Sequence, residues 1–122
     1  MILLVAALAG GLGAAARFVV DGAVRARWSA SVPLGTTVIN VSGSLLLGVL
    51  TGLVLFHGVP SSASLVVGTG FLGGYTTFST ASVEVVRLLQ EQRVRAALLH
   101  TCSMLVLSLG GAAVGLVLVA AL

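Results

Sequence analysis

The sequence has little charge, one cysteine and two prolines. Only 7% of its 122 residues are charged, whereas 58% are hydrophobic. A soluble domain of this composition would leave most of its apolar surface in water, so we expect an integral membrane protein. Cys102 has no second cysteine to pair with, which excludes an intramolecular disulfide. We expect Cys102 to be a small buried hydrophobic residue.

Patterns typical of an enzyme are also missing. The sequence shows no nucleophile–base pair, no cluster of metal-ligating residues and no phosphate-binding loop. His57 and His100 stand near the ends of apolar stretches, where a position at the membrane interface is expected. We therefore predict that the protein is not an enzyme.

Four apolar stretches are present, and each is long enough to cross a bilayer, which takes about 20 residues. They cover residues 2–20, 34–56, 64–86 and 96–121. The first has no basic residue before it, so we interpret it as a retained helix and not as a secretory signal. The prediction is an all-α integral membrane protein, with one four-helix transmembrane domain over residues 1–122.

The basic residues all fall on one side of this predicted bundle. They lie in the first and third loops or at the ends of the preceding spans: Arg17, Arg25, Arg27, Arg87, Arg93 and Arg95. The positive-inside rule then places these loops in the cytoplasm and both termini outside. Membrane topology explains the arginines better than nucleic-acid binding does, so no nucleic-acid partner is expected.

The third predicted span has unusual residues at its centre. Gly73 and Gly74 are followed by Tyr75, Thr76 and Thr77. Glycine weakens a helix interior, and a break there would free carbonyls to bind a cation or amides to bind an anion. A continuous helix that uses these glycines for packing is equally compatible with the composition.

Other polar residues are predicted at membrane depth. Asn40 must find partners or line a wet path, and Thr36 lies on the same helix face. Phe78 could offer a positive ring edge beside Ser79 and Thr80. Neutral donors of this kind suit a small anion that must move on as well as bind. The residues therefore point to small-anion conduction.

Three ordered motifs make the chain resemble the CrcB/Fluc fluoride channels, small four-helix proteins that export fluoride from the microbial cytoplasm. The motifs are Gly10-Gly11-x-Gly13-Ala14-x-x-Arg17-Phe18, Gly35-Thr36-x-x-x-Asn40-x-x-Gly43 and Gly70-Phe71-x-Gly73-Gly74-x-Thr76-Thr77-Phe78-Ser79-Thr80, with Glu84 following. The resemblance implies passive, fluoride-selective export across the plasma membrane through an antiparallel dimer, which would reduce fluoride toxicity.

The resemblance also implies roles for individual residues. The fluoride pore would use Asn40, Phe78, Ser79, Thr80, Ser108 and Thr36. The third helix would be broken near its centre by its glycines, and a structural sodium ion at the dimer centre would bind the backbone carbonyls of Gly73 and Thr76 there; no other cofactor is implied. Packing and structural roles would fall to Gly10, Gly13, Arg17, Gly43, Gly74 and Glu84.

Two features depart from the family pattern. Ala81 stands where a second phenylalanine is usual, and the arginine bias favours one orientation, whereas an antiparallel homodimer needs both. The partner could therefore be a second copy or an oppositely oriented paralogue. Two other functions remain open. A small proton-coupled drug transporter would need a carboxylate within the first span, which instead ends with Arg17 and Asp21. A non-conducting membrane assembly subunit would not explain Asn40 and Phe78.

Overall fold

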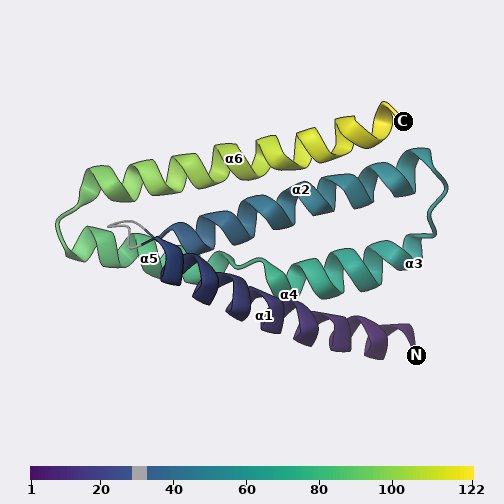
Figure 1. Cartoon of the computed structure of the whole chain (residues 1–122), viewed down its shortest axis with the longest axis horizontal. Helices are drawn as coiled ribbons and strands as arrows, with labels where there is room; N and C mark the ends of the chain where they lie inside the picture. Colours follow the sequence, from purple (N-terminus) through teal and green to yellow (C-terminus); the bar gives the residue numbers. More distant parts are fainter. Residues whose placement is uncertain (29–32) are drawn as a thin grey trace.

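The protein is a bundle of helices arranged as four spans. A computed structural model describes residues 1–28 and 33–122. Its elements are α1 (Ile2–Arg27), α2 (Leu34–Phe56), α3 (Ser61–Ala63), the π-helical η1 (Ser64–Leu72), α4 (Gly73–Tyr75), α5 (Phe78–Gln90) and α6 (Val94–Ala120). In Figure 1, α2 and α6 run side by side, while α1 packs against η1 and α4. Both termini and the α2–α3 connection lie at one end of the bundle.

Helices cover all four stretches predicted as spans, with ends that differ from the prediction. Among the described residues, three helices are long and apolar enough to cross a membrane, namely α1, α2 and α6. The segments α3, η1, α4 and α5 follow one another to form the third span. Helix α1 continues to Arg27, so Arg25 and Arg27 lie in its last turn and not in a loop as predicted. A hydrogen-bonded ion pair from Arg25 to Asp21 (Nε–Oδ2 2.9 Å), four residues earlier, favours this extension. Arg95, also predicted in a loop, lies in the first turn of α6.

The predicted break in the third span is confirmed, but the glycines do not cause it. Gly73 has helical dihedrals (φ −62°, ψ −38°), whereas Thr76 (ψ 162°) and Thr77 (φ −151°, ψ 117°) are extended. A new helix, α5, then begins at Phe78. Its N-terminus is capped by Thr77, whose Oγ1 accepts a hydrogen bond from the Thr80 N–H (3.2 Å).

Several glycines, Gly74 among them, instead allow close contact between helices. A Cβ on Gly74 would collide with the backbone of Gly10, and one on Gly13 with the backbone of Phe71. Gly48 has the same relation to the backbone of α6. Small residues of this kind let helix backbones approach closely in a membrane, where van der Waals packing drives association.

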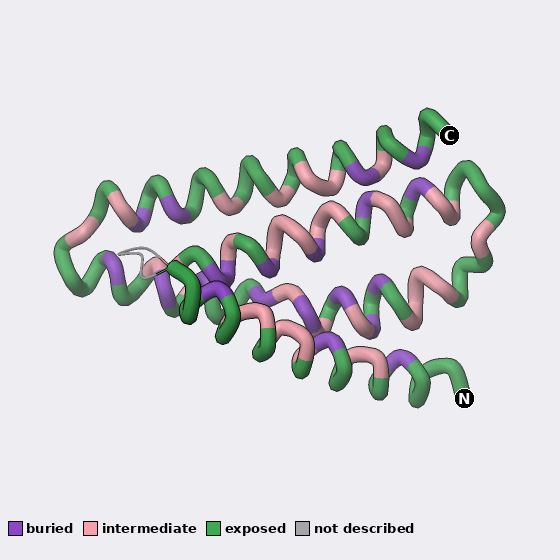
Figure 2. The backbone as a smooth tube through the Cα atoms, viewed as in Figure 1, coloured by how far each residue is buried: buried purple, intermediate pink, exposed green. Residues whose placement is uncertain are grey.

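Few side chains are buried within the single chain, as Figure 2 shows. Large hydrophobic residues are exposed on every long helix, as expected for a surface that faces lipid or another subunit. Cys102 is also exposed, so the expectation that it is buried is wrong for the single chain. The largest fully buried side chains are those of Thr36 and Ile39, both on α2. The interior of the bundle is therefore small and partly polar.

Candidate functional site

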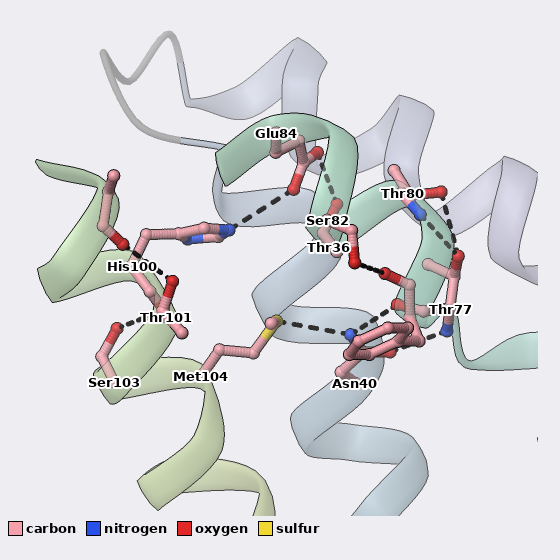
Figure 3. A network of polar contacts seen from close by, with 12 residues as sticks. Thr36, Asn40, Thr77, Thr80, Ser82, Glu84, His100, Thr101, Ser103 and Met104 are labelled. Carbon is pink, nitrogen blue, oxygen red and sulfur yellow. Dashed lines mark hydrogen bonds and ion pairs between the residues drawn. The ribbon is translucent and has the colours of Figure 1, made fainter. Parts of the chain in front are cut away.

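The side chain of Asn40 holds the break in the third span open. Its Oδ1 accepts a hydrogen bond from the Thr77 N–H (2.8 Å), and its Nδ2 donates to the Thr77 carbonyl (3.0 Å). In a continuous helix the Thr77 N–H would instead bond to the Gly73 carbonyl, four residues earlier. The Asn40 bonds therefore release the Gly73 carbonyl from its usual partner. Figure 3 shows this clamp between α2 and the start of α5.

A second contact at the break comes from α1. The Arg17 side chain donates from Nη1 to the Thr76 carbonyl (3.3 Å). The Thr76 hydroxyl donates back to the Leu72 carbonyl (2.9 Å), and the Thr76 methyl group lies against Gly43. The two carbonyls predicted to bind sodium thus lie on either side of the same break, and one of them already accepts a bond from a cationic side chain.

A cavity of about 460 Å³ adjoins the break and brings together three of the predicted pore residues. Asn40, Phe78 and Ser108 line it, together with Met104. The Phe78 ring is 87% exposed, so it stands on the outer surface of the chain. Within the described residues, the Ser108 Oγ is buried without a hydrogen-bond partner. The cavity therefore offers a donor that nothing in the described chain occupies.

The other predicted pore residues lie elsewhere. Thr36 and Thr80 line a second cavity, of about 260 Å³, together with Arg17 and Thr77. The Thr77 hydroxyl donates to the Thr80 hydroxyl (3.0 Å), and the Ser79 hydroxyl lies 3.3 Å from the Thr77 hydroxyl. Thr77 lines both cavities, whereas Ser79 lines neither.

A buried polar trio joins α2, α5 and α6. The Thr36 hydroxyl donates to Glu84 Oε1 (2.6 Å), and His100 Nε2 lies 3.5 Å from Glu84 Oε2. The exposed fractions of Thr36, Glu84 and His100 are 1%, 9% and 3%, so all three side chains are buried within the chain. Sequence reasoning missed the trio because its members are brought together only by tertiary packing.

Ala81 lies on the inner face of α5. It is 2% exposed, and it shares this face with Glu84 and Leu88, at the spacing of successive helical turns. Helix α5 packs here against α6 and α2. The position at which the family resemblance expects a second ring therefore points into the chain, whereas the Phe78 ring points out.

Taken together, the fold and the site define a class: a helical membrane protein in which a broken span meets a cavity with neutral hydrogen-bond donors. Residues 4–116 match the family model described as "CrcB-like protein, Camphor Resistance (CrcB)". The chain belongs to this family, which confirms the resemblance expected from the motifs.

Individual relatives agree with this assignment. The chain is 56% identical over 116 residues to "Fluoride-specific ion channel FluC 1" of Leifsonia xyli subsp. xyli, covering 95% of this chain and 85% of the relative. It is 49% identical over 119 residues to "Fluoride-specific ion channel FluC 2" of Cutibacterium acnes, covering 97% of both. "Fluoride-specific ion channel FluC" of a Methylobacterium is 40% identical over 117 residues, covering 95% of this chain and 94% of the relative. These are names of channels, in agreement with the prediction that the chain is not an enzyme.

Proposed function

We propose that the chain is a subunit of a fluoride-selective channel that lets cytoplasmic fluoride leave down its electrochemical gradient and so reduces fluoride toxicity. The observation that carries the proposal is the cavity beside the broken span. None of the described residues that line it is charged, and its donors come from Asn40 and Ser108, beside the Phe78 ring. Neutral donors can bind a small anion without trapping it. The names of the relatives support fluoride as that anion.

The conducting unit in this proposal is an antiparallel dimer. Phe78 is 87% exposed beside the cavity, so a second subunit would supply the facing wall. That subunit is a second copy or an oppositely oriented paralogue. The arginines gather at one end of the bundle, which favours one fixed orientation and therefore the paralogue. The numerals in the names "FluC 1" and "FluC 2" support the same choice.

The proposed orientation places the arginine-rich loops in the cytoplasm of a microbe and both termini outside its plasma membrane. An epitope tag after Leu122 should then be fully accessible to antibody in intact cells. A tag accessible in half of the molecules and hidden in the rest would contradict a fixed orientation and favour the homodimer.

A structural sodium ion is proposed at the dimer centre, and the residues of the break fit it. The Gly73 carbonyl has lost its helical donor to Asn40. The Thr76 carbonyl accepts one bond from Arg17, and a carbonyl oxygen has a second lone pair. Unwound backbone carbonyls are the ligands that membrane proteins commonly offer to sodium. The ion would tie the two broken spans of the dimer together.

The test of the channel function is fluoride efflux from liposomes that contain the purified protein, with chloride efflux as the control for selectivity. We expect rapid fluoride efflux and little chloride efflux. Ser108→Ala should slow fluoride efflux, because the variant removes a donor from the cavity. Ser103→Ala is the matched control, since the Ser103 hydroxyl bonds to the His100 carbonyl of its own helix (3.2 Å) and Ser103 does not line the cavity.

The same assay separates the two dimers. Efflux from the purified chain alone would support a homodimer. Efflux only after reconstitution with an oppositely oriented paralogue would support the heterodimer, and no efflux in either case would refute the channel function.

A further inference from the structure

The second amide hydrogen of Asn40 has an unusual partner. While one donates to the Thr77 carbonyl, the other points to the sulfur of Met104 on α6 (Nδ2–Sδ 3.4 Å), as Figure 3 shows. A thioether sulfur is a weak acceptor, and the methionine side chain has three rotatable bonds. This donor of the cavity is therefore held by a weak acceptor on a flexible arm.

Met104 contacts the Asn40 donor and also lines the cavity. It lines the same cavity as Asn40 and Ser108, and Ser108 follows it by one helical turn on α6. The Ser108 Oγ is buried without a partner among the described residues. If the sulfur moves aside, the cavity gains a second free donor, and the arm itself has room to move within about 460 Å³.

We propose that Met104 sets the affinity of the cavity for fluoride, because its sulfur occupies the Asn40 donor until the anion displaces it. This inference rests on the proposed channel function. Hydrogen bonds to an ionised acceptor are roughly twice as strong as those between neutral groups, so a small anion wins the exchange. The sulfur regains the donor when the anion moves on. Conduction needs binding that is favourable but not too tight, and a weak built-in competitor supplies that balance.

The first experiment observes Met104 directly. The sequence has only two methionines, Met1 and Met104, so the full chain labelled with ¹³C in the methionine methyl groups gives two signals, which Met104→Leu assigns. In lipid nanodiscs, a fluoride titration should shift the Met104 signal progressively and leave the Met1 signal in place. The same concentrations of chloride should shift neither.

The second experiment separates the sulfur from the bulk of the side chain. Met104→Leu keeps the volume but removes the acceptor, so the fluoride concentration for half-maximal efflux should fall about two- to five-fold, the factor that corresponds to the weaker part of the range for a neutral hydrogen bond, since a thioether is a weak acceptor. Ser103→Ala, on the same helix but outside the cavity, is the control and should leave this concentration unchanged. If Met104→Leu matches the wild type while Met104→Ala speeds efflux, Met104 acts by bulk alone and the inference is wrong.

The outcomes distinguish this inference from the channel function. Selective fluoride efflux with an unmoved Met104 signal would overturn the role of Met104 and leave the channel function standing. An absence of efflux both alone and with a paralogue, together with an unmoved signal, would refute both. A fluoride-specific shift of the Met104 signal, together with a lower half-maximal fluoride concentration in Met104→Leu, would establish that the sulfur and fluoride compete for the Asn40 donor.

Discussion

Replacing Asn40 with alanine should destabilise the protein by removing the clamp on the broken span. The variant leaves the Thr77 N–H and carbonyl without the two bonds of 2.8 and 3.0 Å. A buried backbone group that loses its partner costs about 1–3 kcal/mol. Polar contacts within membrane proteins average only about 0.6 kcal/mol, because the released groups find other partners. Thr77 lines two cavities, so water can reach part of it. We therefore expect a loss of about 2 kcal/mol for the two bonds together.

Reversible unfolding in mixed detergent micelles measures this loss. Thr51→Ala on the same helix is the control, because the exposed Thr51 hydroxyl bonds only to the Leu47 carbonyl of its own turn, and its loss should cost less than about 0.5 kcal/mol. Amide hydrogen exchange gives a local readout, since the Thr77 amide should exchange faster in Asn40→Ala. Equal stability of the two variants, with unchanged exchange at Thr77, would refute the clamp.

Two further predictions use the same unfolding assay. Gly74→Ala should destabilise the protein by about 1–3 kcal/mol, because the new methyl group meets the backbone of α1. In the control Gly11→Ala, the methyl group meets nothing within 4 Å, so the change should be neutral or stabilise the helix by up to about 1 kcal/mol. Equal effects of the two variants would contradict the packing role of Gly74. Ala81→Phe should lower the free energy of unfolding by about 1–3 kcal/mol and leave fluoride efflux no faster, because position 81 is buried within the chain. A stable variant with faster efflux would show instead that the ring reaches the pore.

Hydropathy and charge predicted the number of spans well but their ends less well. Residues 34–56 are predicted and observed as one helix, because the segment is mostly apolar, has no charged residue, and follows Pro33. The first span is predicted to end at residue 20, just before Asp21. It continues to Arg27, because Asp21 and Arg25 pair on the helix surface and so satisfy each other there.

The broken span shows what pattern alone could not predict. Glycine weakens helices on average, yet Gly73 and Gly74 are both helical, and Gly74 packs so closely against Gly10 of α1 that a side chain there would collide with its backbone. The break falls at Thr76 and Thr77, where a side chain 37 residues away, that of Asn40, replaces the helical partner of the backbone. Such a long-range bond leaves no signal in local composition. The Asn40–Met104 contact is hidden for the same reason.

Thr77 lines both the cavity of about 460 Å³ and that of about 260 Å³, and this position affects how the membrane voltage acts on transport. Where water fills two cavities on either side of a wall, the membrane voltage falls mainly across the wall, because water is far more polarisable than protein. One elementary charge crossing 100 mV exchanges about 2.3 kcal/mol with the field. If water fills both cavities in the assembled protein, much of that energy would be exchanged near Thr77, and substitutions at Thr77 should change the voltage dependence of transport.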